Sequence, residues 1–132
     1  MSGFTNFLEE ALLNHVLRNA EYISPATIYV ALFNDVPGDP GTGTEVTGTG
    51  YVRLPVTFAA PTQVGGAARC VTDVVLEWPV AESAWGTIEA AAIYDAETGG
   101  NMLVPAELAT PRTISSQDIF RIPVGDLSVS LD

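Results

Sequence analysis

Seven short runs of β-branched, aromatic and aliphatic residues follow one another along most of this chain, separated by segments rich in proline and glycine. The runs lie at residues 26–33, 51–58, 69–78, 86–95, 101–108, 119–124 and 127–132. Short strands at this spacing are typical of an antiparallel β-sandwich. We therefore predict a mainly β fold, a jelly-roll-like sandwich of about seven strands.

Two local signals refine this prediction. Pro55 falls inside the second run and lacks an amide hydrogen, so this strand is expected at a sheet edge or in a bulge. Gly125-Asp126 separates the last two runs and predicts a hairpin turn between them.

Only the N-terminal segment carries a helical pattern. Apolar residues recur at three- and four-residue steps from residue 4 to residue 17, and Asn6 and Glu9 have the spacing of a capping box. We expect a helix at about residues 6–19, followed by the sandwich at about 26–132, in a single domain that spans residues 1–132. The apolar stripe is wider than a lone surface helix needs, so the helix should pack on more than one side, in its own chain or on another.

Charge excludes several classes of partner. The net charge is −11, and the five basic residues are all arginine. Nucleic acid is not an expected partner, because binding it depends on neutralising phosphates with Lys and Arg. An anionic membrane surface is disfavoured for the same reason, and no apolar run approaches the roughly 20 residues of a membrane span. The N-terminus is acidic where a secretory leader would be basic, so we expect synthesis in a cytoplasm.

The chain is poor in the groups that catalysis and metal binding need. His15 and Cys70 are its only histidine and cysteine. Zinc sites recruit such residues in threes or fours, so we expect His15 to pack on the helix face or at an interface and Cys70 to be a small buried hydrophobe. A carboxylate-only glycosidase is formally open, but sixteen carboxylates make some suitable pair inevitable. We predict no enzyme activity, no catalytic residue and no cofactor.

The longest irregular stretch is the loop at residues 34–50. It is glycine-rich, but a strand rather than a helix follows it, which excludes a phosphate loop. Asp35, Asp39 and Glu45 could supply oxygen ligands to calcium, although their spacing matches no recognised calcium loop. We predict no metal site, leave ion binding by this loop open, and favour a loop that contacts a neighbouring subunit.

Trp78 and Trp85 flank a break between two predicted strands. Large rings in such positions usually anchor a core, and a ligand platform is the alternative.

Short motifs then occur in a fixed order over nearly the whole chain. They are Pro-Ala-Thr-Ile-Tyr-Val at 25–30, Gly-Tyr at 50–51, Trp-Gly at 85–86, Ile-Tyr-Asp-Ala at 93–96, Gly-Gly-Asn at 99–101 and Thr-Pro-Arg-Thr at 110–113. In this order the chain resembles a family of small virion proteins of tailed bacteriophages, often labelled tail fibre proteins. The resemblance implies a structural role in the virion and brings no catalytic residues.

The resemblance leaves two structural roles in the virion open, and a receptor-binding function is a third possibility. A fibre usually has a shaft of repeats or coiled coil, and none is visible, so we favour a capsid decoration (cement) protein that binds across capsid subunits and stabilises the head. Its partners would be the major capsid protein and copies of itself in a homo-oligomer. The alternative is a tail fibre or tail-tip adaptor, or a receptor-binding module that meets a host surface receptor through Tyr22, Tyr51 or Tyr94.

The over-wide helix stripe and the long loop supply the candidate interaction residues. These are Phe4, Phe7, Leu8, Leu12 and Leu17 on the helix, and Asp39, Thr42, Glu45 and Thr47 in the loop. The sequence leaves open head or tail location, oligomeric state, host and strand order, and whether the helix packs in its own chain or on a partner.

Overall fold

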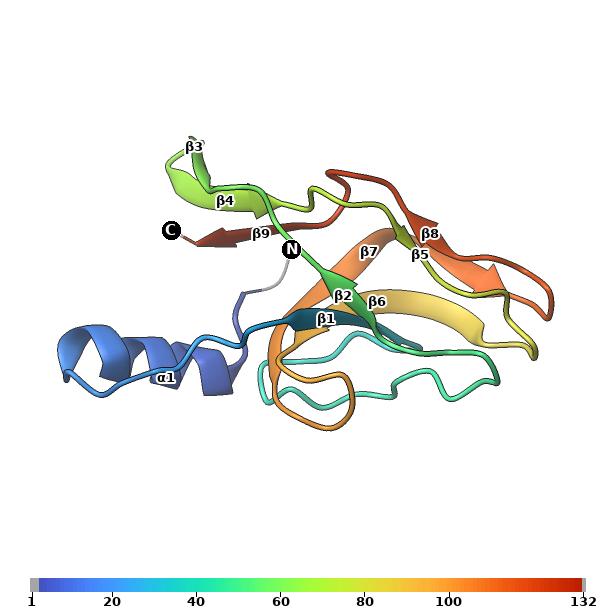
Figure 1. Cartoon of the computed structure of the whole chain (residues 1–132), viewed down its shortest axis with the longest axis horizontal. Helices are drawn as coiled ribbons and strands as arrows, with labels where there is room; N and C mark the ends of the chain where they lie inside the picture. The colour runs from blue at the N-terminus through green and yellow to red at the C-terminus, as the bar shows by residue number, and fades with distance from the viewer. Residues whose placement is uncertain (1–2, 132) are drawn as a thin grey trace.

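The computed structural model describes residues 3–131, which form one helix and nine strands (Figure 1). The helix is α1 (Asn6–Leu17). The strands are β1 (Ile28–Phe33), β2 (Leu54–Val56), β3 (Thr62–Val64), β4 (Ala67–Val71), β5 (Leu76–Glu77), β6 (Gly86–Tyr94), β7 (Met102–Ile114), β8 (Arg121–Ile122) and β9 (Ser128–Leu131).

The strands form three antiparallel sheets. The largest has the order β2-β1-β6-β7, the second β3-β4-β9, and the third pairs β5 with β8. β2 lies at an edge of the first sheet, which confirms the position expected for Pro55. A mainly β, antiparallel fold with one helix is thus confirmed, while the jelly-roll-like sandwich and the single-domain boundaries stay predictions.

The strand count differs from the expected seven. The run at 69–78 is divided into β4 and β5, which belong to different sheets, and β3 precedes a turn at Gly65-Gly66 that the patterns did not reveal. The predicted hairpin at Gly125-Asp126 is wrong, because β8 pairs with β5 and β9 with β4. The reason lies at Thr72, whose amide donates to the carbonyl of Leu127 and whose carbonyl accepts from Gly125. These bonds draw the chain toward β4 instead.

Both tryptophans lie in the main core, as the sequence predicted. Trp78 is 1% exposed and Trp85 is 3% exposed. Their indole N–H groups donate to the carbonyls of Val52 at 2.9 Å and Thr49 at 3.1 Å. Buried rings of this kind cannot serve as an open ligand platform.

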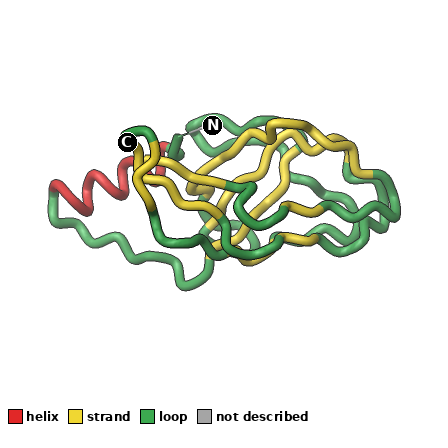
Figure 2. The backbone as a smooth tube through the Cα atoms, turned by 90° about the horizontal axis from the view of Figure 1, so that it is seen from above, coloured by secondary structure: helices red, strands yellow, loops and turns green. Residues whose placement is uncertain are grey.

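Helix α1 begins at a different cap from the expected one. Thr5, not Asn6, is the N-cap: its Oγ1 accepts a hydrogen bond from the amide of Leu8 and donates to the carbonyl of Met102 at 2.7 Å. Because Thr5 thereby caps α1 and bonds to β7 at once, it fixes where the helix leaves the sheet. The helix ends at Leu17 rather than at residue 19, and Nδ1 of His15 lies 3.2 Å from the amide of Tyr22 beyond it. Figure 2 shows α1 projecting from one end of the strands.

Candidate interaction surface

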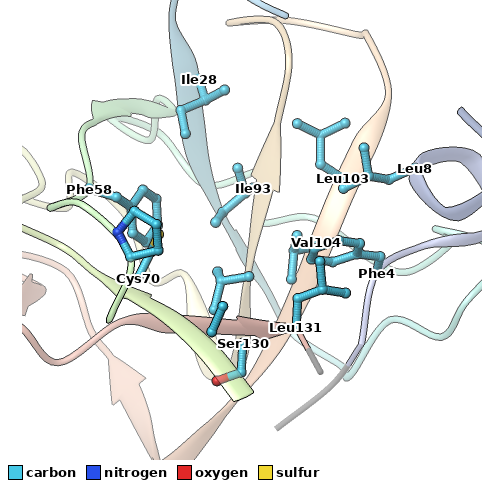
Figure 3. Close-up of a pocket in the computed structure, with 13 residues that line it drawn as sticks. Phe4, Leu8, Ile28, Phe58, Cys70, Ile93, Leu103, Val104, Ser130 and Leu131 are labelled. Atoms are coloured by element: carbon cyan, nitrogen blue, oxygen red, sulfur yellow. The ribbon is translucent and has the colours of Figure 1, made fainter. Parts of the chain in front are cut away.

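An apolar cavity of about 400 Å³ lies where α1 meets the strands (Figure 3). Its lining comes from the segment that enters α1, from α1 itself, and from β1, β4, β6, β7 and β9. Phe4, Leu8, Cys70 and Leu103 line it, and among the described residues Ser130 supplies its only hydroxyl. We call this space the inner cavity. Its lining offers hydrocarbon to an occupant and almost no polar group.

A second, larger hollow of about 680 Å³ adjoins the inner cavity and shares Phe4, Ser130 and Leu131 with it. We call it the α1–β9 groove. It is lined by Gly3, Phe4, Glu9, Leu12, Leu13, Val16, Leu17, Ser130 and Leu131. Within residues 3–131, Glu9 is the one charged residue of its lining, in a chain whose net charge is −11. A mainly apolar surface of this kind suits contact with another macromolecule.

Helix α1 has two apolar faces. Leu8 is buried against Ile93, Leu103 and Val104. On the other face Leu13, Val16 and Leu17 are 59%, 73% and 75% exposed. Their spacing of three and four residues places these three side chains on one side of the helix. The second face therefore has no cover within residues 3–131.

The structure divides the helix residues predicted as contacts. Phe4, Leu8 and Leu12 pack toward the domain or line the hollows, and Leu17 lines the α1–β9 groove while it stays 75% exposed. Phe7 is 41% exposed and lines neither hollow.

The prediction did not include Leu13, Val16 or Leu131. The three- and four-residue spacing from Leu13 to Leu17 was the signal for the first two. No local pattern indicated that the last strand would lie beside the helix.

The loop at 34–50 folds back on β1, and none of its residues lines either hollow. The amide of Asn34 donates to the carbonyl of Thr44, and the amide of Val46 donates to the carbonyl of Leu32, both at 2.9 Å. The carbonyl of Asp39 accepts from the amide of Asn6, so only this end of the loop meets the helix. Thr42 and Thr47 are exposed elsewhere.

Two of the three carboxylates of the loop bond within the protein itself. Asp35 accepts a hydrogen bond from the amide of Thr44, and Glu45 pairs with Arg53. The described part of the chain, residues 3–131, holds no group of three metal-ligating side chains. Nor does any helix in the described residues have the length and apolar character needed to cross a bilayer.

Glu45 and Arg53 form the most buried charged contact, which we call the Arg53 latch. Nε and Nη2 of Arg53 donate to the two carboxylate oxygens of Glu45, each at 2.9 Å. Nη1 donates to the carbonyls of Ala96 and Gly99 in the turn between β6 and β7. The guanidinium also lies 3.7 Å from the centre of the Tyr94 ring. One side chain thus joins the loop at 34–50 to a turn that is distant in sequence.

The ionisation of these groups follows from their contacts. Burial raises the pKa of Glu45, but hydrogen bonds from Arg53 and Tyr51 outweigh it, so the pKa is lowered overall. Burial, followed by the hydrogen bond to Glu45, raises the pKa of Tyr51. The latch therefore holds a carboxylate, a guanidinium and a neutral phenol at neutral pH. Tyr51 and Tyr94 are half-buried in it, which leaves little of either ring for a receptor.

Comparison with known proteins gives one family match. A family model named Gp80, described as podophage GP4 fiber I protein gp80, matches residues 3–130. The match confirms the resemblance to tailed-phage virion proteins seen in the sequence motifs. A search of curated proteins found no match.

Proposed function

The chain belongs to the Gp80 family of podophage fibre proteins, and on this premise we propose that it is a non-enzymatic structural protein of the virion, part of a tail fibre assembly. The observation that carries the proposal is the uncovered apolar face of α1 together with the α1–β9 groove. Together they form a surface on which another virion protein can dock.

The energetics favour association through this surface. Leu13, Val16 and Leu17 are each well over half exposed. Covering such a side chain fully is worth about 1.5–3 kcal/mol. A partner that covers these three side chains and the groove beside them gains hydrophobic free energy, which offsets part of the cost of association. The carboxylates on the rest of the surface keep the free chains apart until then.

The mechanism we propose is associative. The chain binds the assembled particle and stabilises that state by mass action, with no covalent step. Copies of itself are included among the expected partners, and nucleic acid and membranes are not. The family supports a non-enzymatic role, and the low content of histidine and cysteine agrees with it.

Capsid decoration is the second candidate. It is favoured by the architecture of residues 3–131, in which one helix of 12 residues and nine strands include no shaft-like coiled coil. In that role the same apolar surface would lie across neighbouring copies of the major capsid protein. The family description favours the fibre, so we place decoration second. A receptor-binding tip is a variant of the fibre role.

The copy number of the chain in purified particles separates these roles. Quantitative mass spectrometry would give its ratio to the major capsid protein. A small number of copies per particle supports the fibre assembly. A ratio near that of the capsid protein contradicts the fibre and supports decoration. Absence from the particle contradicts both virion roles.

A further inference from the structure

Strand β9 is an edge strand without the usual protection. It pairs with β4 on one side, and within residues 3–131 no strand pairs with its other side. The edge strand β2 contains Pro55, and the edge strand β7 contains two prolines and charged residues. β9 reads Ser-Val-Ser-Leu and, like the three-residue edge strand β3, has neither a charge nor a proline. Proteins commonly place charged residues or prolines on exposed edge strands, because these residues prevent pairing with another chain. An edge strand without them can pair with a strand of another chain.

The free edge of β9 runs along the α1–β9 groove. Ser130 and Leu131 are neighbours in a strand, so their side chains point to opposite faces of the sheet. Both nevertheless line the groove. No residue of β4 lines the groove, so the groove lies on the side of β9 away from its partner strand. Figure 3 shows Leu131 near Phe4 and Val104, where the inner cavity adjoins this edge.

From these two observations we propose that the α1–β9 groove binds an extended segment of another virion protein, which adds a strand to β9. This inference rests on the proposed virion role, because the segment is taken to belong to another protein of the virion. Its side chains on one face would enter the inner cavity between β9 and Leu103. Its backbone would pair with the outward N–H and C=O groups of β9.

The unpaired backbone groups of β9 favour an extended strand, not a helix, as the occupant of the groove. Any partner that covers the groove also removes the free edge of β9 from water. A buried backbone group without a hydrogen-bond partner costs about 1–3 kcal/mol. A helix satisfies its own backbone and cannot supply those bonds, whereas an extended segment can.

Charge and shape define the segment further. The inner cavity takes apolar side chains, so the segment alternates apolar and polar residues. Among the described residues, Glu9 is the only charged residue that lines the groove. The chain carries a net charge of −11, so a Lys or Arg at an end of the segment is favoured. The groove has α1 as one wall and β9 as the other, which suits a single segment better than the edge of a second folded copy.

Cys70 provides the test on the isolated chain. It is the only cysteine and lines the inner cavity, so a strand seated in the groove shields its thiol from a disulfide reagent. The probe is a short synthetic peptide that alternates valine and threonine between terminal lysines. At about 1 mM peptide we expect the rate of Cys70 modification to fall about tenfold. A peptide with the same side chains but N-methylated backbone amides is the control, and it should give little protection.

Two charge variants locate the site on the sheet. Ser130→Lys places a charge on the free edge of β9, and Gln63→Lys places the same charge on β3, the opposite edge of the same sheet. We expect the first to weaken protection by about tenfold and the second to leave it unchanged.

Three results would overturn the proposal. The first is that the peptide does not protect Cys70, and the second is that the N-methylated peptide protects it equally well. The third is that, without any peptide, protection of Cys70 rises with protein concentration while sedimentation shows dimers. The last would mean that a second copy fills the groove. None of them bears on whether the chain is in the virion, which the copy number decides separately.

Discussion

The Arg53 latch allows a quantitative prediction for Glu45→Gln. The amide keeps the shape of the side chain but removes the charge opposite a guanidinium whose residue is 8% exposed. Removing one partner of a buried ion pair lowers the free energy of unfolding by about 3–5 kcal/mol. The side chain of Glu45 is 27% exposed, so water offsets part of this loss, and we expect the free energy of unfolding to fall by about 2–3 kcal/mol. That is a large share of the 5–15 kcal/mol typical of a domain.

Urea unfolding followed by tryptophan fluorescence measures this change, because both tryptophans are buried in the core. Glu97→Gln is the matched control: Glu97 is exposed beside the same turn, and its substitution should change stability by less than about 0.5 kcal/mol. Removing both partners, as in Glu45→Gln with Arg53→Met, should cost less than the two single changes added together. If Glu45→Gln unfolds like Glu97→Gln, the guanidinium is solvated and the latch does not hold the loop.

The same latch predicts the direction of a pH effect. The pKa of Glu45 is lowered in the folded chain, so the unfolded chain binds the proton more tightly. The stabilisation by ionised Glu45 is therefore fully present above the ordinary carboxyl pKa and is lost as pH falls through the lowered one. We expect wild type and Glu45→Gln to differ most near neutral pH and to converge on acidification. A difference that grows as pH falls would contradict this sign.

Two further changes test the packing. A methyl group at Gly48 would clash with the ring of Trp85, so Gly48→Ala should destabilise the fold by about 1–3 kcal/mol in urea unfolding. As a control, a methyl group at Gly3 meets no atom within 4 Å, so Gly3→Ala should be near neutral. Thr5→Ala removes a buried hydroxyl that caps α1 and bonds to β7, and should cost about 1–2 kcal/mol in thermal unfolding by circular dichroism. Thr5→Ser keeps the hydroxyl and should recover most of that loss, and equal losses for Ala and Ser would show that the hydroxyl is not the cap.

Local patterns predicted the parts of the fold that depend on neighbouring residues. The helix and most strands follow from apolar periodicity, and the edge position of β2 follows from the missing amide of Pro55. The division of residues 69–78 and the separation of β8 from β9 depend on the bonds of Thr72 to Gly125 and Leu127. Those partners are more than fifty residues away, so no short pattern reveals them.

The candidate surface was predicted only in part for the same reason. The wide apolar stripe indicated that α1 packs against two surfaces. The structure shows one of them, which is formed by the strands around Leu103. The hollow on the other side depends on β9 lying beside α1, which joins the two ends of the described chain. The partnership of Glu45 with Arg53 was equally hidden, because the loop between them carries no pattern that brings them together.

The central claim is that the exposed face of α1 attaches this chain to the virion. Its most direct test is the occupancy of particles assembled with Val16→Glu. Val16 is 73% exposed, so the variant should fold normally, yet it would place a carboxylate in the proposed contact. We expect occupancy to fall about tenfold or more, while Thr110→Glu, the same added charge on an exposed part of β7, leaves it unchanged. Full occupancy by folded Val16→Glu would show that the chain attaches through another surface.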